Sequence, residues 1–200
     1  MSIRYKSLIL NRLQNIYQMA CALTKGRLLP CKAAFGGIKA VYLADFGDIQ
    51  SLAFAADTFI ATITGAGGLT WAKYDLKGNS SLETTVTSSR ENGTTFYTQT
   101  LNMTLTFLDA VTQNQLEIVA LGRPYAVVED YYGNFLLCGY ENGMEVTGGT
   151  VVTGAAAGDL SGFTLTMEGM EEKAPFFTAV PTPITASPIN PTLNAPPAVS

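Results

Sequence analysis

The sequence predicts a mainly β protein: an antiparallel β-sandwich or barrel with one flanking internal helix, an N-terminal helix and an extended Pro-rich C-terminal tail. Three observations predict it: many short segments with period-two alternation, a single helical segment among them, and a change of composition after Glu172. Runs of strands interrupted once by a helix are typical of a sandwich or barrel. We therefore expect an N-terminal helical arm (1–35), a β-sandwich domain (36–172) and a C-terminal arm (173–200).

The first element expected is a helix over residues 3–23. Ile9, Leu13 and Ile16 recur at steps of four and three, which places them on one narrow apolar stripe. Such a stripe packs either on a second copy or on its own domain, and the pattern does not choose between them. We take these three residues as candidate oligomer-interface positions.

The clearest strand is expected from Phe96 to Phe107. Leu101, Met103 and Leu105 alternate there with Asn and Thr, which gives the strand one apolar and one polar face. Other segments with strand character are bounded by Gly, Pro or Asn. They lie at residues 39–43, 51–55, 58–64, 69–76, 81–88, 125–129, 135–140, 145–153 and 162–170.

The internal helix is expected from Asp109 to Leu121. Asp109 has the side chain of an N-cap, and Gly122 with the following Pro stops the helix. Its inward face is predicted to be Leu116, Val119 and Ala120.

The C-terminal segment differs from everything before it. Seven of the nine prolines lie between Pro175 and Pro197, a composition that favours an extended arm over a packed element.

The overall composition favours a protein that assembles. Apolar residues make up 47% of the chain and charged residues only 14%, against about 25% charged in an average soluble domain. A surface with so few charges is either buried in partners or prone to aggregate. An ordinary Thr- and Gly-rich β domain is the alternative.

The charges are unevenly distributed. Seven of the twelve basic residues precede Asp45, and no acidic residue does. A basic arm next to an acidic body can bind nucleic acid, a membrane surface or an acidic neighbour. Since the body itself is acidic, docking on a sister subunit is the interpretation we favour.

The residue types argue against an enzyme. The chain has no histidine, which excludes Ser-His-Asp and Cys-His nucleophile systems and His-bearing zinc sites. Cys21, Cys31 and Cys138 are too few for a four-Cys zinc site, and the Gly-rich segments match no nucleotide-binding motif. The sequence predicts no catalytic residues, no metal, no cofactor and, with no long apolar stretch, no membrane span.

One polar connection stands out between two Thr-rich strands. Residues 84–95 contain Arg90, Glu91, Asn92 and Gly93, which combine opposite charges with a turn-forming pair. A protruding hairpin of this kind can reach an adjacent subunit, whereas an ordinary turn is simply solvated. These four residues are the second set of candidate oligomer-interface positions.

Several motifs resemble tail proteins of bacteriophages, particularly crAss-like and related phages of gut Bacteroides. They are Ser88–Tyr97, the Gly-Arg-Pro at 122–124, Val127–Asp130, Glu141–Thr150 and Thr153–Gly162. Met19–Arg27 resembles the start of such proteins, so the resemblance covers residues 19–177.

The resemblance implies a virion structural protein, made in the bacterial host cytoplasm and located in the virion tail. It would be a tail-tube or tail-ring subunit that closes into a six- or twelve-fold ring around the DNA channel. Implied partners are copies of itself and neighbouring tail or connector proteins, with DNA passing through without specific binding.

A different class of function is also compatible with the sequence. A receptor- or carbohydrate-binding β-sandwich module of a phage tail could use Trp71, Tyr74, Tyr131 and Tyr132 as an aromatic platform. Packing in the core and in turns is the alternative role for these aromatics, and it is the one we favour.

Overall fold

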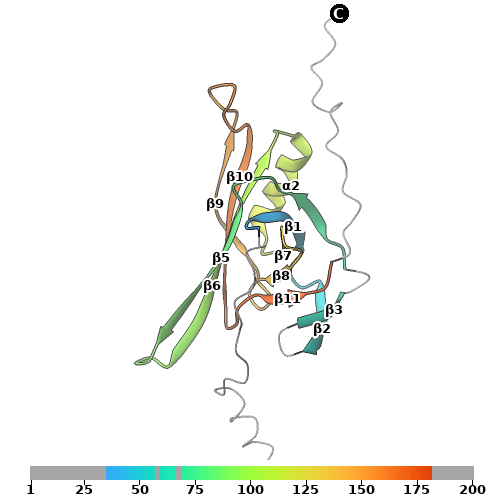
Figure 1. The fold of residues 1–200 in the computed structure, drawn as a ribbon, viewed down its shortest axis with the longest axis vertical. Coiled ribbons are helices and arrows are strands. Elements are labelled where there is room, and N and C mark those ends of the chain that lie inside the picture. The colour runs from blue at the N-terminus through green and yellow to red at the C-terminus, as the bar shows by residue number, and fades with distance from the viewer. Residues whose placement is uncertain (1–34, 57–58, 66–68, 182–200) are drawn as a thin grey trace, which may run out of the picture. The chain divides into compact units, whose positions relative to one another are not determined.

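The protein is mainly β, with one helix and two sheets, as the sequence predicts (Figure 1). The structure is a computed structural model and describes residues 35–56, 59–65 and 69–181. These residues belong to the second of the two units into which the chain divides, which begins at Phe35.

The larger sheet contains seven strands. Their order is β2 (Ile49–Ala56), β3 (Phe59–Gly65), β11 (Phe176–Thr178), β8 (Phe135–Cys138), β7 (Tyr125–Asp130), β1 (Ile38–Ala44) and β4 (Ala72–Asp75). All neighbouring strands run antiparallel except β11 and β3, which are parallel.

The smaller sheet contains four antiparallel strands. Their order is β5 (Ser81–Ser89), β6 (Thr94–Thr106), β10 (Gly162–Glu171) and β9 (Glu145–Val152). The register between β6 and β10 is unbroken from Gly162–Thr106 to Glu171–Tyr97.

The main core lies between the two sheets. Leu101 and Met103 of β6 and Met167 of β10 face Val41 and Val128 of the larger sheet, and all five are almost completely buried. The period-two alternation predicted for residues 96–107 therefore marks the buried face of β6. Among the described strands both sheets remain open, so the sandwich is correct and the barrel alternative is wrong.

A second core covers the other face of the larger sheet. Tyr42 of β1 and Val127 of β7 pack there with Ile60 of β3 and with Trp71. Strands β1 and β7 are thus buried on both faces, which explains why their sequences are nearly continuous apolar runs and not alternating ones.

The helix α2 (Ala110–Leu121) connects the sheets between β6 and β7. Asp109 caps it as predicted, with a carboxylate oxygen accepting from the Thr112 backbone N–H at 2.8 Å. Leu116 is buried and Val119 half-buried, but Ala120 is exposed, because only one edge of the helix contacts the sheets. Within the described part of the chain, no helix is long and apolar enough to cross a membrane.

Strand β11 lies within the segment predicted to be an extended arm. Phe176 pairs with Leu137 of β8, and Phe177 pairs with Phe59 of β3. Residues 176–178 therefore belong to the larger sheet. Residues 182–200 lie outside the described residues.

Candidate assembly surfaces

The β5–β6 hairpin projects beyond the rest of the smaller sheet, toward the lower left of Figure 1. Strand β10 accompanies β6 only as far as Tyr97, whereas β5 continues to pair with β6 as far as Thr94. The distal part, residues 87–96, is therefore a two-stranded ribbon without a third strand.

The four predicted interface residues Arg90, Glu91, Asn92 and Gly93 form the turn at the tip of this ribbon. The Asn92 backbone N–H donates to Ser89 Oγ at 3.3 Å, and Gly93 has a φ of 63°, a conformation that glycine adopts without strain. Neither Arg90 nor Glu91 forms an ion pair with a described residue. Both charges are therefore available to a partner.

The N-terminal set of predicted interface residues, Ile9, Leu13 and Ile16, lies outside the described residues.

The smaller sheet has free edges on opposite sides. Strand β5 forms one edge and β9 the other, and both are mostly exposed. Because three antiparallel pairings separate them, β5 and β9 run in opposite directions. An edge-to-edge contact between β5 of one copy and β9 of the next would continue the antiparallel pattern.

The outer face of the smaller sheet carries a row of carboxylates. Glu83 and Glu168 both stand opposite Thr100, and Glu168 stands opposite Glu145. Directly opposed residues point to the same face, so the three side chains line up across four strands. None of them forms an ion pair with another described residue. This acidic row faces away from the core.

A groove of about 290 Å³ lies beside the acidic row. Its wall includes Arg123, Glu145, Glu168 and the exposed Met170. In the described ranges, no group of three or more acidic or Cys side chains is placed to hold a metal ion.

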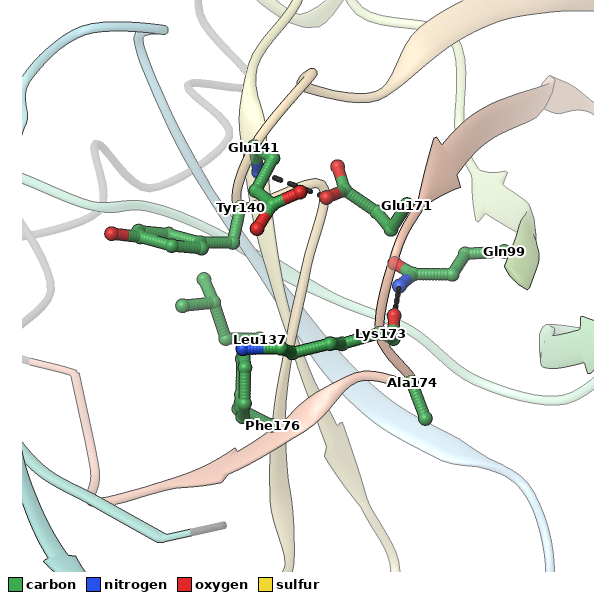
Figure 2. Close-up of a pocket in the computed structure, with 8 residues that line it drawn as sticks. All are labelled: Gln99, Leu137, Tyr140, Glu141, Glu171, Lys173, Ala174 and Phe176. Carbon is green, nitrogen blue, oxygen red and sulfur yellow. Dashed lines mark hydrogen bonds between the residues drawn. The ribbon is translucent and has the colours of Figure 1, made fainter. Parts of the chain in front are cut away.

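Glu171, one of the acidic residues considered in the sequence, holds a turn in place (Figure 2). Its carboxylate accepts from the backbone N–H groups of Glu141 and Asn142, at 3.0 Å each. Burial raises the pKa of Glu171 above its ordinary value, although these two hydrogen bonds act in the opposite direction. The contacts tie the β8–β9 turn to the end of β10.

Gln99 completes the same pocket. Its side chain accepts from the Gly139 backbone N–H at 3.1 Å and donates to the Lys173 carbonyl at 3.3 Å. The cavity measures about 10 Å³, room for one water molecule at most. This constellation fastens backbone segments together, and it offers no space for a substrate.

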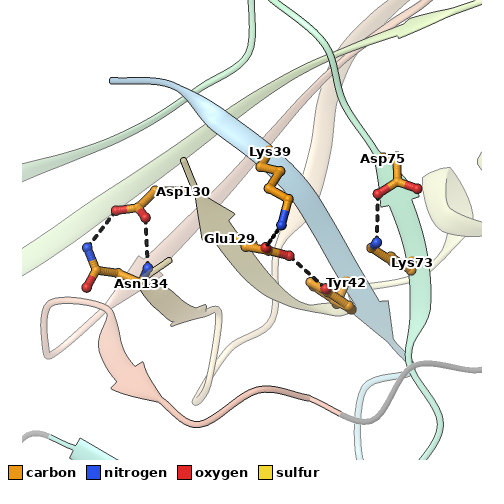
Figure 3. A network of polar contacts seen from close by, with 7 residues as sticks. All are labelled: Lys39, Tyr42, Lys73, Asp75, Glu129, Asp130 and Asn134. Atoms are coloured by element: carbon orange, nitrogen blue, oxygen red, sulfur yellow. Dashed lines mark hydrogen bonds and ion pairs between the residues drawn. The ribbon is translucent and has the colours of Figure 1, made fainter. Parts of the chain in front are cut away.

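A second polar cluster belongs to the larger sheet (Figure 3). Glu129 is 6% exposed and accepts from Lys39 Nζ and from the Tyr42 hydroxyl, the latter at 2.8 Å. Burial, followed by the interaction with Glu129, raises the pKa of Tyr42. Every oxygen of this carboxylate thus has a partner within the fold.

The four aromatic residues considered as a binding platform do not share one surface. Trp71 is buried in the second core, and Tyr74 packs against the main core. Tyr131 and Tyr132 are exposed at the β7–β8 turn, where Tyr131 contacts Phe35 edge to face. Core packing therefore accounts for two of the four.

Sequence reasoning missed the acidic row, because its members lie far apart along the chain and come together only through strand register. It also missed the exposed Phe59 and Phe177. The adjacent Phe176 and Phe177 in a Pro-rich segment were the available signal.

Comparison with known proteins adds no relative to this description: no protein-family model, no curated protein and no solved structure matches the chain.

Proposed function

We propose that this chain is a virion structural protein, a phage tail-tube or tail-ring subunit that assembles into a closed ring around a DNA channel. The observation that carries the proposal is the smaller sheet, with free edges on opposite sides and a hairpin that projects past it. A contact between two different surfaces of identical subunits generates a ring when the rotation closes. Edges β5 and β9 supply two such surfaces.

The acidic row supports the second half of the proposal. Glu83, Glu145 and Glu168 carry negative charge on the face of the sheet that points away from the core. Phosphates bind where Lys and Arg neutralise them, and this face presents the opposite charge. A channel lined by such a face lets DNA pass without holding it. Copies of itself and neighbouring tail or connector proteins are the partners proposed.

The hairpin tip gives the first test of this function. Replacing Arg90 and Glu91 together with Ala should leave the thermal unfolding of the monomer almost unchanged, because both side chains are exposed and lack partners in their own chain. In a ring the loss recurs at every boundary. We expect the concentration at half-assembly to rise by up to about fivefold, the equivalent of one exposed ion pair.

Sedimentation velocity across a concentration series measures the shift. The double variant Lys77→Ala/Glu117→Ala is the control, since it removes the same two charges from exposed positions away from the hairpin. Unchanged assembly in the hairpin variant, with the fold intact, would identify the tip as a solvated turn.

A further inference from the structure

An apolar row crosses the larger sheet from the core into solvent. Val128, Leu136, Phe177 and Phe59 stand opposite one another on β7, β8, β11 and β3. Paired residues share a face of the sheet. Val128 is 1% exposed in the core between the sheets, whereas Phe177 and Phe59 are 47% and 40% exposed. The row begins as core and ends as an open surface of two adjacent phenylalanines, here called the Phe59–Phe177 surface.

This surface differs from isolated exposed apolar residues, which are ordinary in proteins. Its two rings are neighbours in register and continue a buried row. A contiguous apolar area joined to the core is typical of a docking site, because covering it extends the core.

The segment that follows β11 has the chemistry to cover it. Residues 182–200 carry no charge, contain five prolines, and include Ile184, Ile189 and Leu193. Pro188 and Pro191 have the PxxP spacing. Uncharged Pro-rich segments bind aromatic surfaces in the polyproline II conformation, since little conformational entropy remains to be lost on binding.

We propose that residues 182–200 of one copy dock on the Phe59–Phe177 surface of a second copy. Phe177 precedes the segment by only a few residues, so the segment of the same chain would have to reverse direction immediately to cover it. In the polyproline II conformation the segment reaches about 60 Å, whereas a domain of this size has a radius of gyration of about 15 Å. It therefore extends past its own body to a neighbour.

The proposal rests on the proposed function in that assembly places the two copies side by side. It adds a second contact, distinct from the β5 and β9 edges, in which an arm of one subunit is strapped onto the next. The β3–β11 pair receives the arm.

Two full-length variants test this contact by complementation. The surface variant is Phe59→Ser/Phe177→Ser, and the tail variant is Ile184→Ser/Ile189→Ser/Leu193→Ser. Each alone should need about tenfold more protein to associate in sedimentation velocity, because each removes one side of the contact. An equal mixture should recover a substantial part of the association, since the intact tail of one meets the intact surface of the other. Tyr132→Ser, another exposed aromatic change, should have no effect.

A labelled synthetic peptide of residues 182–200 gives an independent measurement on the unaltered protein. It should bind with rising fluorescence anisotropy and, in excess, reduce association of the wild-type chain. The same peptide with the three apolar residues replaced by Ser should do neither. This arm needs no change in the body, so it stands even if the surface variant fails to fold.

The outcomes separate the proposal from the function on which it rests. Association that is unchanged in both variants, or a mixture no better than its components, means that the segment covers its own body or nothing, and overturns the proposal while leaving ring assembly intact. A wild-type chain that never associates removes the proposed function, and failure of the peptide to bind the wild-type chain overturns the docking surface in either case.

Discussion

Replacing Gly162 with Ala should lower the free energy of unfolding by about 3 kcal/mol or more. A Cβ atom at this position would lie 2.0 Å from the Leu105 carbonyl oxygen. Gly162 pairs with Thr106 on one side and Val152 on the other, so neither neighbouring strand can move away without breaking the ladder. The clash is with backbone, which has no alternative rotamer.

Gly148→Ala is the matched control in the same sheet. A Cβ at Gly148 would meet no atom within 4 Å, and Ala in a strand costs less backbone entropy than Gly. Its unfolding free energy should stay within about 0.5 kcal/mol of the wild type. Urea denaturation followed by circular dichroism compares the two. Equal effects of the two substitutions would show that β6 and β10 do not approach as closely as described.

Replacing Glu129 with Ala should be the second large effect, about 2–4 kcal/mol. The side chain is buried on β7, and its loss leaves the buried Tyr42 hydroxyl without its acceptor and Lys39 without its partner (Figure 3). The missing side chain also leaves a cavity beside the second core, to which Tyr42 belongs.

Asp75→Ala provides the comparison within the same figure. Asp75 pairs with Lys73 at 2.8 Å, but its side chain is 74% exposed. An exposed pair contributes less than about 1 kcal/mol, so thermal and urea unfolding should barely change. If Glu129→Ala were equally mild, water would have to satisfy Tyr42, and the buried cluster would carry no special weight in stability.

The features predicted from sequence are the local ones. The alternation of Leu101, Met103 and Leu105 locates β6, because a strand's side-chain period is written into adjacent residues. Asp109 fixes the start of α2 in the same way. The Arg90–Gly93 turn was equally visible, since its strands are joined directly.

The features missed are those that depend on distant partners. Strand β11 has only three residues, and its pairing with β3 brings Phe177 to Phe59, far apart in the chain. Gly162 gives no sign in the sequence that a backbone oxygen stands where its Cβ would be. Such contacts exist only after the sheets have formed, so neither period nor composition records them.

The most direct test of ring assembly is the symmetry of the particles that the purified full-length chain forms. Electron microscopy with two-dimensional class averaging, alongside mass photometry of the same sample, measures symmetry and copy number together. The account predicts closed rings with six- or twelve-fold symmetry and a matching particle mass. A chain that remains monomeric across the concentration range, or that forms only irregular aggregates without rotational symmetry, would contradict it.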